Sequence, residues 1–223
     1  MQICLSQTQL FRGLEEEEIA QLLQCLGTVR RHYEKEAVIL AEGAPTEQIG
    51  LVLSGRVMIS LSDVWGNNSV LGSVGPGECF AEAYACVPDE PLLVHVTAAE
   101  ESWILFLNVR RALSPCACAC AAHSGLIRQL LALCAGKNLQ MARRMQHTTP
   151  KTIRGRLLSY FSECVKRSGQ YSFTIPYNRQ QLADYLSVDR SALCSELSKM
   201  RRAGLLRYER NLFDLSSAAG LIE

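Results

Sequence analysis

The spacing of hydrophobic residues changes several times along the 223-residue chain. After four consecutive glutamates, Ile19, Leu22 and Leu26 recur at helical intervals, which predicts a short amphipathic helix with an acidic first turn. Between residues 33 and 108 short apolar runs alternate with glycine-rich turns, which favours a closed or rolled antiparallel β unit. The predicted strands lie in residues 37–40, 49–53, 57–61, 70–74 and 103–107.

Residues 124–148 predict one long helix that carries two apolar rows. The second row, Leu126, Leu130 and Leu133, covers only the first half and is expected to pack on the helix's own domain. Asn138 either meets its equivalent on a partner chain or faces solvent near a frayed end. The first row is spaced 4, 3, 4, 3, 4 like a coiled-coil seam and predicts a dimer interface of Ile127, Leu131, Cys134, Asn138, Met141 and Met145.

Pro150 predicts the end of this long helix, because the residue before a proline is disfavoured in the α conformation. A further amphipathic helix follows from Ile153 and closes at Ser168-Gly169. We therefore expect three segments, with boundaries at 1–121, 122–148 and 149–223.

Residues 178–206, NRQQLADYLSVDRSALCSELSKMRRAGLL, have the pattern of a helix-turn-helix. Asn178 can cap the first helix, and the small Ala183 permits close approach of the two helices. After a turn at 187–189, the second helix would bury its leucines and enter the DNA major groove. Residues 205–215 predict a hairpin or wing.

The outward side chains of this motif are suited to DNA. Arginine can pair with guanine through two hydrogen bonds, serine and lysine can reach bases or backbone, and the start of the first helix can reach phosphates. The alternative is a two-helix corner with a solvated basic face. The predicted DNA-binding residues are Arg179, Gln180, Arg190, Ser191, Cys194, Ser195, Lys199 and Arg201.

Charge is distributed unevenly along the chain. Residues 1–121 hold 7 Lys/Arg and 15 Asp/Glu, residues 122–149 hold 4 Lys/Arg and no acid, and residues 150–223 hold 12 and 7. The net charges are therefore −8, +4 and +5. A basic C-terminal half suits a polyanionic partner, and the acidic half is expected to have another task.

The N-terminus lacks the basic start and apolar run of a secretory signal. The longest uncharged stretch, Ala112 to Ile127, is interrupted by Ser114-Pro115, so it does not predict a membrane span. We expect a cytoplasmic protein without a membrane partner, in which the ten cysteines are reduced thiols.

The sequence does not predict catalysis. It carries no Ser/His/Asp order, P-loop or nucleotide fingerprint, and its four histidines form no metal-ligand pattern. A β-roll enzyme fused to a DNA-binding tail would need two or three inward histidines, whereas residues 33–108 supply only His95. We therefore expect no enzyme activity.

With these features the chain resembles the cyclic-AMP receptor and fumarate-nitrate reduction (Crp/Fnr) family of bacterial transcription regulators. The resemblance covers nearly the whole chain. It lies in the long helix and in the segments LFRGLEEEEIAQLL, GLVLSGRVMISL, GPGECFAEA and FTIPYNRQQLADYLSVDRSALCSELSKMRRAGLL.

The resemblance implies an α+β fold: an N-terminal antiparallel β-roll like the cyclic-nucleotide-binding jelly roll, a long dimerisation helix and a C-terminal winged helix-turn-helix. It implies a homodimer on a two-fold DNA operator, with RNA polymerase as a further partner and an effector in the β-roll. Ser195 stands where an arginine is common in the family, which puts the standard operator sequence in doubt.

The expected effector site departs from the family pattern. Gly77-Glu78 match the start of the cyclic-nucleotide cassette, but Leu92-Leu93 stand where Arg-Ser would neutralise the cyclic phosphate. Burying a phosphate without a cation costs several kcal/mol, so cyclic AMP is not the expected effector. Either the leucines line a pocket for an apolar small molecule, with Glu78 and His95 as polar groups, or they fill the roll and nothing binds. The candidate effector residues are Gly77, Glu78, Cys79, Leu92, Leu93 and Val94.

A run of cysteines before the long helix suggests a second type of sensor. Cys116, Cys118, Cys120 and His123 could hold a metal or an iron-sulfur cluster, act as a thiol redox switch, or be inert filler. Members of the family with a cluster carry cysteines near the N-terminus, where this chain has only Cys4 and Cys25. No cofactor is firmly predicted, and a metal or redox sensor of the same fold is the alternative function.

Overall fold

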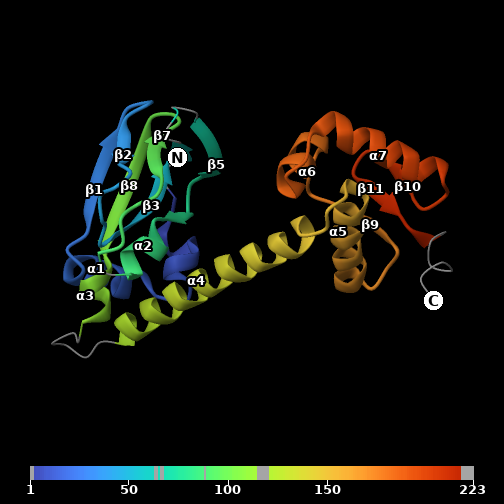
Figure 1. Ribbon diagram of the computed structural model, residues 1–223. Helices are drawn as coiled ribbons and strands as arrows, with labels where there is room; N and C mark the ends of the chain where they lie inside the picture. The colour runs from blue at the N-terminus through green and yellow to red at the C-terminus, as the bar shows by residue number, and fades with distance from the viewer. Residues whose placement is uncertain (1–2, 63–64, 66–67, 88, 115–120, 217–223) are drawn as a thin grey trace. The chain divides into compact units, whose positions relative to one another are not determined.

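The computed structural model describes residues 3–62, 65, 68–87, 89–114 and 121–216. The chain divides into two compact units, Met1–Gly136 and Lys137–Glu223 (Figure 1). The long helix α4 (Ala121–Thr148) begins three residues earlier than predicted, ends before Pro150 as predicted, and contributes residues to both units. None of the helices among the described residues is long and apolar enough to cross a membrane.

The N-terminal unit is built from two four-stranded sheets whose strands pair antiparallel, in the orders β1-β8-β3-β6 and β2-β7-β4-β5. The predicted β-roll is therefore confirmed, although the sequence pattern missed β1, β6 and β7. The strands are β1 (Val29–Tyr33), β2 (Val38–Leu40), β3 (Gln48–Ser54), β4 (Val57–Ser62), β5 (Asn68–Val74), β6 (Cys79–Phe80), β7 (His95–Ala98) and β8 (Ser102–Asn108).

Helical segments accompany these sheets. The predicted N-terminal helix is α1 (Glu16–Cys25), in which Glu15 and Glu18 form a capping box. The short helices α2 (Glu82–Cys86) and α3 (Val109–Leu113) were not predicted, because each has only five residues and no measurable period. The chain begins with two 3-10 turns, Leu5–Gln7 and Gln9–Phe11.

Strand β3 is buried on both faces and separates two apolar clusters. Val52 points into the space between the sheets with Phe80 and Phe106. Its neighbours Leu51 and Leu53 point to the opposite face, because successive side chains of a strand alternate. On that outer face they join a cluster with α1 and with Leu126, Leu130 and Leu133 of α4, so the second apolar row of the long helix packs on its own unit, as predicted.

The C-terminal unit has one apolar core. It contains α5 (Ile153–Ser168), α6 (Arg179–Leu186), α7 (Arg190–Arg202) and a three-stranded sheet in the order β10-β11-β9. Strands β10 (Arg207–Glu209) and β11 (Leu212–Asp214) form the predicted wing, whereas β9 (Ser172–Thr174) was missed because it is only three residues long. The rings of Phe161, Phe173 and Phe213 pack together at the centre of this core.

Gly50 shows how closely the interior of the β-roll is packed. It pairs with Phe106 of β8 on one side and with Phe80 of β6 on the other. The two phenylalanine rings meet edge to face, with centroids 6.3 Å apart. A Cβ on Gly50 would overlap the Phe80 ring, so this strand position requires glycine.

We predict that Gly50→Ala destabilises the N-terminal unit by about 1–3 kcal/mol, because Phe80 must move out of its packed position. Gly72→Ala is the matched control, since a Cβ there meets no atom within 4 Å. Urea unfolding followed by tryptophan fluorescence measures this unit alone, because Trp65 and Trp103 both lie in it. Equal stability of the two variants would contradict the packing.

Candidate DNA interface and sensor site

Helices α6 and α7 form the predicted helix-turn-helix in the C-terminal unit. The Asn178 side chain accepts a hydrogen bond from the backbone N–H of Gln181 at 2.9 Å, and the Gln181 side chain accepts one from the backbone N–H of Asn178 at 2.9 Å. This capping box starts α6. Ser187 then turns the chain in the left-handed conformation, with φ 54°, and Asp189 caps α7 by accepting from the Ala192 amide.

Contact between the two helices depends on small and apolar side chains. Ala183 is fully buried, so the backbone of α6 lies close to α7. Leu193, Leu197 and Met200 of α7 are also fully or almost fully buried. A helix that buries this stripe must present its opposite face to solvent. The predicted inward leucines are confirmed.

The opposite face of α7 carries the predicted base-reading side chains. Of the predicted DNA-binding residues on α7, Ser191, Ser195 and Lys199 lie exposed on this face, Arg190 and Arg201 are exposed toward its sides, and Cys194 is half-buried. The Ser191 hydroxyl donates a hydrogen bond to the carboxylate of Asp189. Together with the hydrogen bond from the Ala192 backbone amide, it lowers the pKa of Asp189. The cap is therefore ionised at neutral pH, and Ser191 is held at the start of α7.

Arg179 has a role that the sequence did not reveal. Its Nη2 donates to the Arg210 carbonyl oxygen at 2.6 Å, and its guanidinium lies over the rings of Tyr208 and Phe213 at 5.1 and 5.0 Å. These contacts join α6 to the wing. Arg179 is therefore partly engaged by its own unit, while its predicted phosphate contact stays a prediction.

A shallow hollow of about 590 Å³ separates the starts of α6 and α7 from the wing turn. Of the residues in the described part of the chain that line it, three are arginines and none is an acid. Amide groups at helix N-termini and nearby arginines favour phosphate. The sequence analysis missed the two wing residues of this hollow. The hollow is lined by Asn178, Arg179, Gln180, Arg190, Arg210 and Asn211.

The candidate effector site differs from the expected apolar wall. Leu92 is 1% exposed and Leu93 is 58% exposed, with Val94 half-buried. The Leu92 backbone is held by hydrogen bonds to Gly43 and Ala44, and adjacent side chains then point in different directions. Leu92 and Leu93 therefore do not face the same side, and their part in an effector site stays a prediction.

The polar groups of the candidate effector site are also engaged within the protein. Gly77 adopts φ 83°, and the Glu78 carboxylate accepts from the Gly75 amide at 2.7 Å, so it closes its own turn. His95 Nε2 lies 3.2 Å from a carboxylate oxygen of Glu42, and its Nδ1 faces the Glu42 amide at 3.4 Å. Cys79 is buried in the outer apolar cluster. His95 therefore serves a loop contact rather than the expected ligand contact.

The predicted cysteine cluster lies mostly outside the described residues, since Cys116, Cys118 and Cys120 are not among them. His123 is buried in the first turns of α4. Among the residues that the structure describes, no three His, Cys, Asp or Glu side chains are grouped to hold a metal.

A different cysteine pair was not predicted from the sequence. The side chains of Cys86 in α2 and Cys134 in α4 hydrogen-bond to each other. Burial, followed by Cys134 and Glu82, raises the pKa of Cys86 to about 11. The Cys86 thiol is therefore protonated at neutral pH and is a poor nucleophile. Cys134, assigned to the dimer seam, packs against its own unit.

Most of the predicted dimer seam lies on the surface of α4. Leu131, Met141 and Met145 are about two-thirds exposed, and Ile127 and Asn138 are also exposed. The neighbouring row of leucines is buried. The helix therefore presents one apolar row to solvent after the other has packed on its own unit.

Two family models match this chain. The model of the cyclic nucleotide-binding domain matches residues 30–117, and the model of the Crp-like helix-turn-helix domain matches residues 155–223. A search of curated proteins found no match.

Solved structures with this architecture are similar over most of their length. The catabolite activator protein of Thermus thermophilus is 22% identical, covers 96% of each chain and has a TM-score of 0.50. CprK complexed with OCPA is 15% identical over 91% of this chain and 92% of that chain, with a TM-score of 0.63. The c-di-GMP responsive regulator CLP of Xanthomonas campestris is 18% identical over 90% and 99%, with a TM-score of 0.54. At these identities the likeness shows the fold alone.

We predict that Arg190→Ala weakens binding to a specific operator by about 1–3 kcal/mol and binding to unrelated DNA much less, because a base contact carries sequence information. Arg202→Ala removes an equal charge from the same helix and is the control. Gel-shift titrations on both DNAs at one salt concentration measure the two affinities. If Arg190→Ala lost the same affinity for both DNAs, the prediction that Arg190 reads bases would be contradicted.

Proposed function

Because the chain belongs to the Crp/Fnr family of bacterial transcription regulators, we propose that it is a homodimeric DNA-binding regulator controlled by a small effector in its β-roll. The carrying observation is helix α7, which buries Leu193, Leu197 and Met200 and leaves a row of arginine, serine and lysine side chains exposed. Such a row fits the major groove of DNA. The family is one of transcription regulators, which agrees with the lack of a catalytic motif.

The exposed seam of α4 supports the dimer. Side chains such as Leu131, Met141 and Met145 expose apolar surface at coiled-coil spacing, and pairing with a second copy removes that surface from water. A two-fold dimer places two α7 helices about one DNA turn apart, which suits a palindromic operator. From the family resemblance we further propose RNA polymerase as a partner and the cytoplasm as the location.

The proposed effector is not cyclic AMP. Leu92 and Leu93 supply no positive charge at the position where the family pattern has Arg-Ser, and Leu92 is buried. A cyclic phosphate placed there would lose its hydration without gaining an ion pair. Without a cation at this position, the two alternatives from the sequence remain an apolar effector or a roll filled by its own side chains.

We predict that Leu131→Arg converts the protein to a monomer and abolishes specific operator binding, because two guanidinium groups would meet in the seam. Ala132→Arg is the control, since this exposed residue lies beside the seam. Light scattering after size exclusion gives the mass, and sequence selection from random DNA gives the operator. A dimeric Leu131→Arg variant would contradict the seam, and selection of non-palindromic DNA by the wild-type protein would contradict the two-fold operator.

We predict that cyclic AMP at millimolar concentration leaves the melting temperature unchanged, because a ligand that does not bind the folded state cannot stabilise it. Differential scanning fluorimetry measures this, with 5′-AMP as a control for general nucleotide effects. A saturable rise with cyclic AMP that 5′-AMP does not produce would contradict the Leu92-Leu93 argument.

A further inference from the structure

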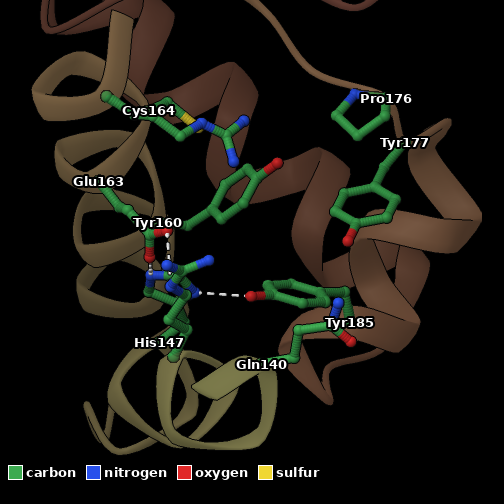
Figure 2. Close-up of a pocket in the computed structure, with 10 residues that line it drawn as sticks. Gln140, His147, Tyr160, Glu163, Cys164, Pro176, Tyr177 and Tyr185 are labelled. Atoms are coloured by element: carbon green, nitrogen blue, oxygen red, sulfur yellow. Dashed lines mark hydrogen bonds and ion pairs between the residues drawn. The ribbon is translucent and has the colours of Figure 1, made fainter. Parts of the chain in front are cut away.

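A pocket of about 320 Å³ lies within the C-terminal unit, apart from the residues of the proposed DNA contact (Figure 2). Its walls come from the last turns of α4, from α5, from the segment that leads into α6 and from the end of α6. This volume lies at the lower end of the range for small-molecule sites, about 300–1,000 Å³. The pocket therefore has room for a ligand of one ring.

One side of the pocket is aromatic. The rings of Tyr177 and Tyr185 are stacked, with centroids 5.1 Å apart and planes at 25°. The Tyr160 ring lies 5.5 Å from that of Tyr185 and 6.1 Å from that of Tyr177. Figure 2 shows the three rings turned toward one another. Flat aromatic surfaces of this kind favour flat aromatic ligands.

Tyr160 and Tyr185 stay neutral at physiological pH. Burial raises the pKa of Tyr160 above its ordinary value and raises the pKa of Tyr185 to about 12. Neutral phenols add no negative charge to the pocket and keep their O–H groups as donors. The aromatic side of the pocket is therefore compatible with an anion.

Among the described residues that line this pocket, Glu163 carries the one carboxylate, and it is directed to partners within the protein. His147 is almost fully buried, with Nδ1 2.9 Å from the Tyr185 hydroxyl oxygen and Nε2 2.7 Å from Glu163 Oε2. The other oxygen of Glu163 lies 3.8 Å from Nε of Arg143. Glu163 thus joins α4 to α5, and its negative charge is directed to Arg143 and His147 of α4.

Arg167 adds a second positive charge to the lining. Arg167 and Cys164, which lie three residues apart on α5, both line the pocket. The lining carries Arg143 and Arg167 against the single carboxylate of Glu163. The excess charge is positive, which favours a negatively charged ligand.

We propose that this pocket binds a monocyclic aromatic carboxylate, with its ring against the tyrosines and its carboxylate paired with Arg167. A planar guanidinium can hold a carboxylate through two parallel hydrogen bonds. The size, the aromatic wall and the excess positive charge all select this class. Ligand binding in this pocket does not require the proposed DNA contact, so the ligand proposal and the DNA-binding proposal can fail separately.

The test is calorimetric titration of the full-length protein with benzoate. We expect saturable binding of benzoate with a millimolar Kd. Benzamide, which lacks the charge, and cyclohexanecarboxylate, which lacks the aromatic ring, should show no saturable binding. Arg167→Gln should weaken benzoate binding about tenfold, because one charge-assisted contact is lost. Lys166→Gln, which removes the adjacent exposed cation outside the lining, should leave the Kd unchanged.

Three results would overturn the proposal. They are the absence of saturable benzoate binding, equal binding of benzoate and benzamide, and equal Kd values for wild-type protein and Arg167→Gln. Arg167 is exposed, so its replacement is expected to leave folding intact. An unchanged circular dichroism spectrum of the variant would confirm that it folds. Tyr177→Leu provides a second test, because it removes the stacked ring but keeps an apolar side chain, and it should also weaken binding.

Discussion

The packing of one apolar row of α4 on the N-terminal unit is the contact on which the rest of the structure depends. Leu126, Leu130 and Leu133 join the apolar cluster on the outer face of β3 and fix which way the helix is rotated. Because the rotation is fixed, the seam row, including Leu131 and Met141, must face away from that cluster. One hydrophobic contact thus sets the face that is left for a partner.

The last turns of the same helix belong to the C-terminal unit. Arg144 donates to the carbonyl oxygens of Asp184 and Tyr185 at 3.0 and 3.1 Å, where α6 ends and its carbonyl groups lack partners within the helix. His147 contacts Tyr185 and Glu163 in the same region. A single helix therefore supplies structural contacts within each of the two units.

The sequence predicted the helix-turn-helix unit better than the β-roll. In α6 and α7 the period of apolar residues, the small Ala183 and the caps all agree, and local chemistry of this kind is visible in sequence. In the β-roll, by contrast, Leu92 and Leu93 looked equivalent, and only their backbone pairing with Gly43 and Ala44 separates a buried side chain from an exposed one. The pocket beside His147 left no sequence signal, because its residues come from three separate segments.

The sequence by itself determined the element types, the two apolar rows of the long helix and the helix-turn-helix, because each depends on residues a few positions apart. The tertiary structure alone decided which groups remain available. It directs Arg179 to the wing and Cys134 to Cys86. It also gathers the tyrosines of α5 and α6 around His147. These pairings join residues far apart in the chain, and the free energy of such contacts depends on packing that no local pattern encodes.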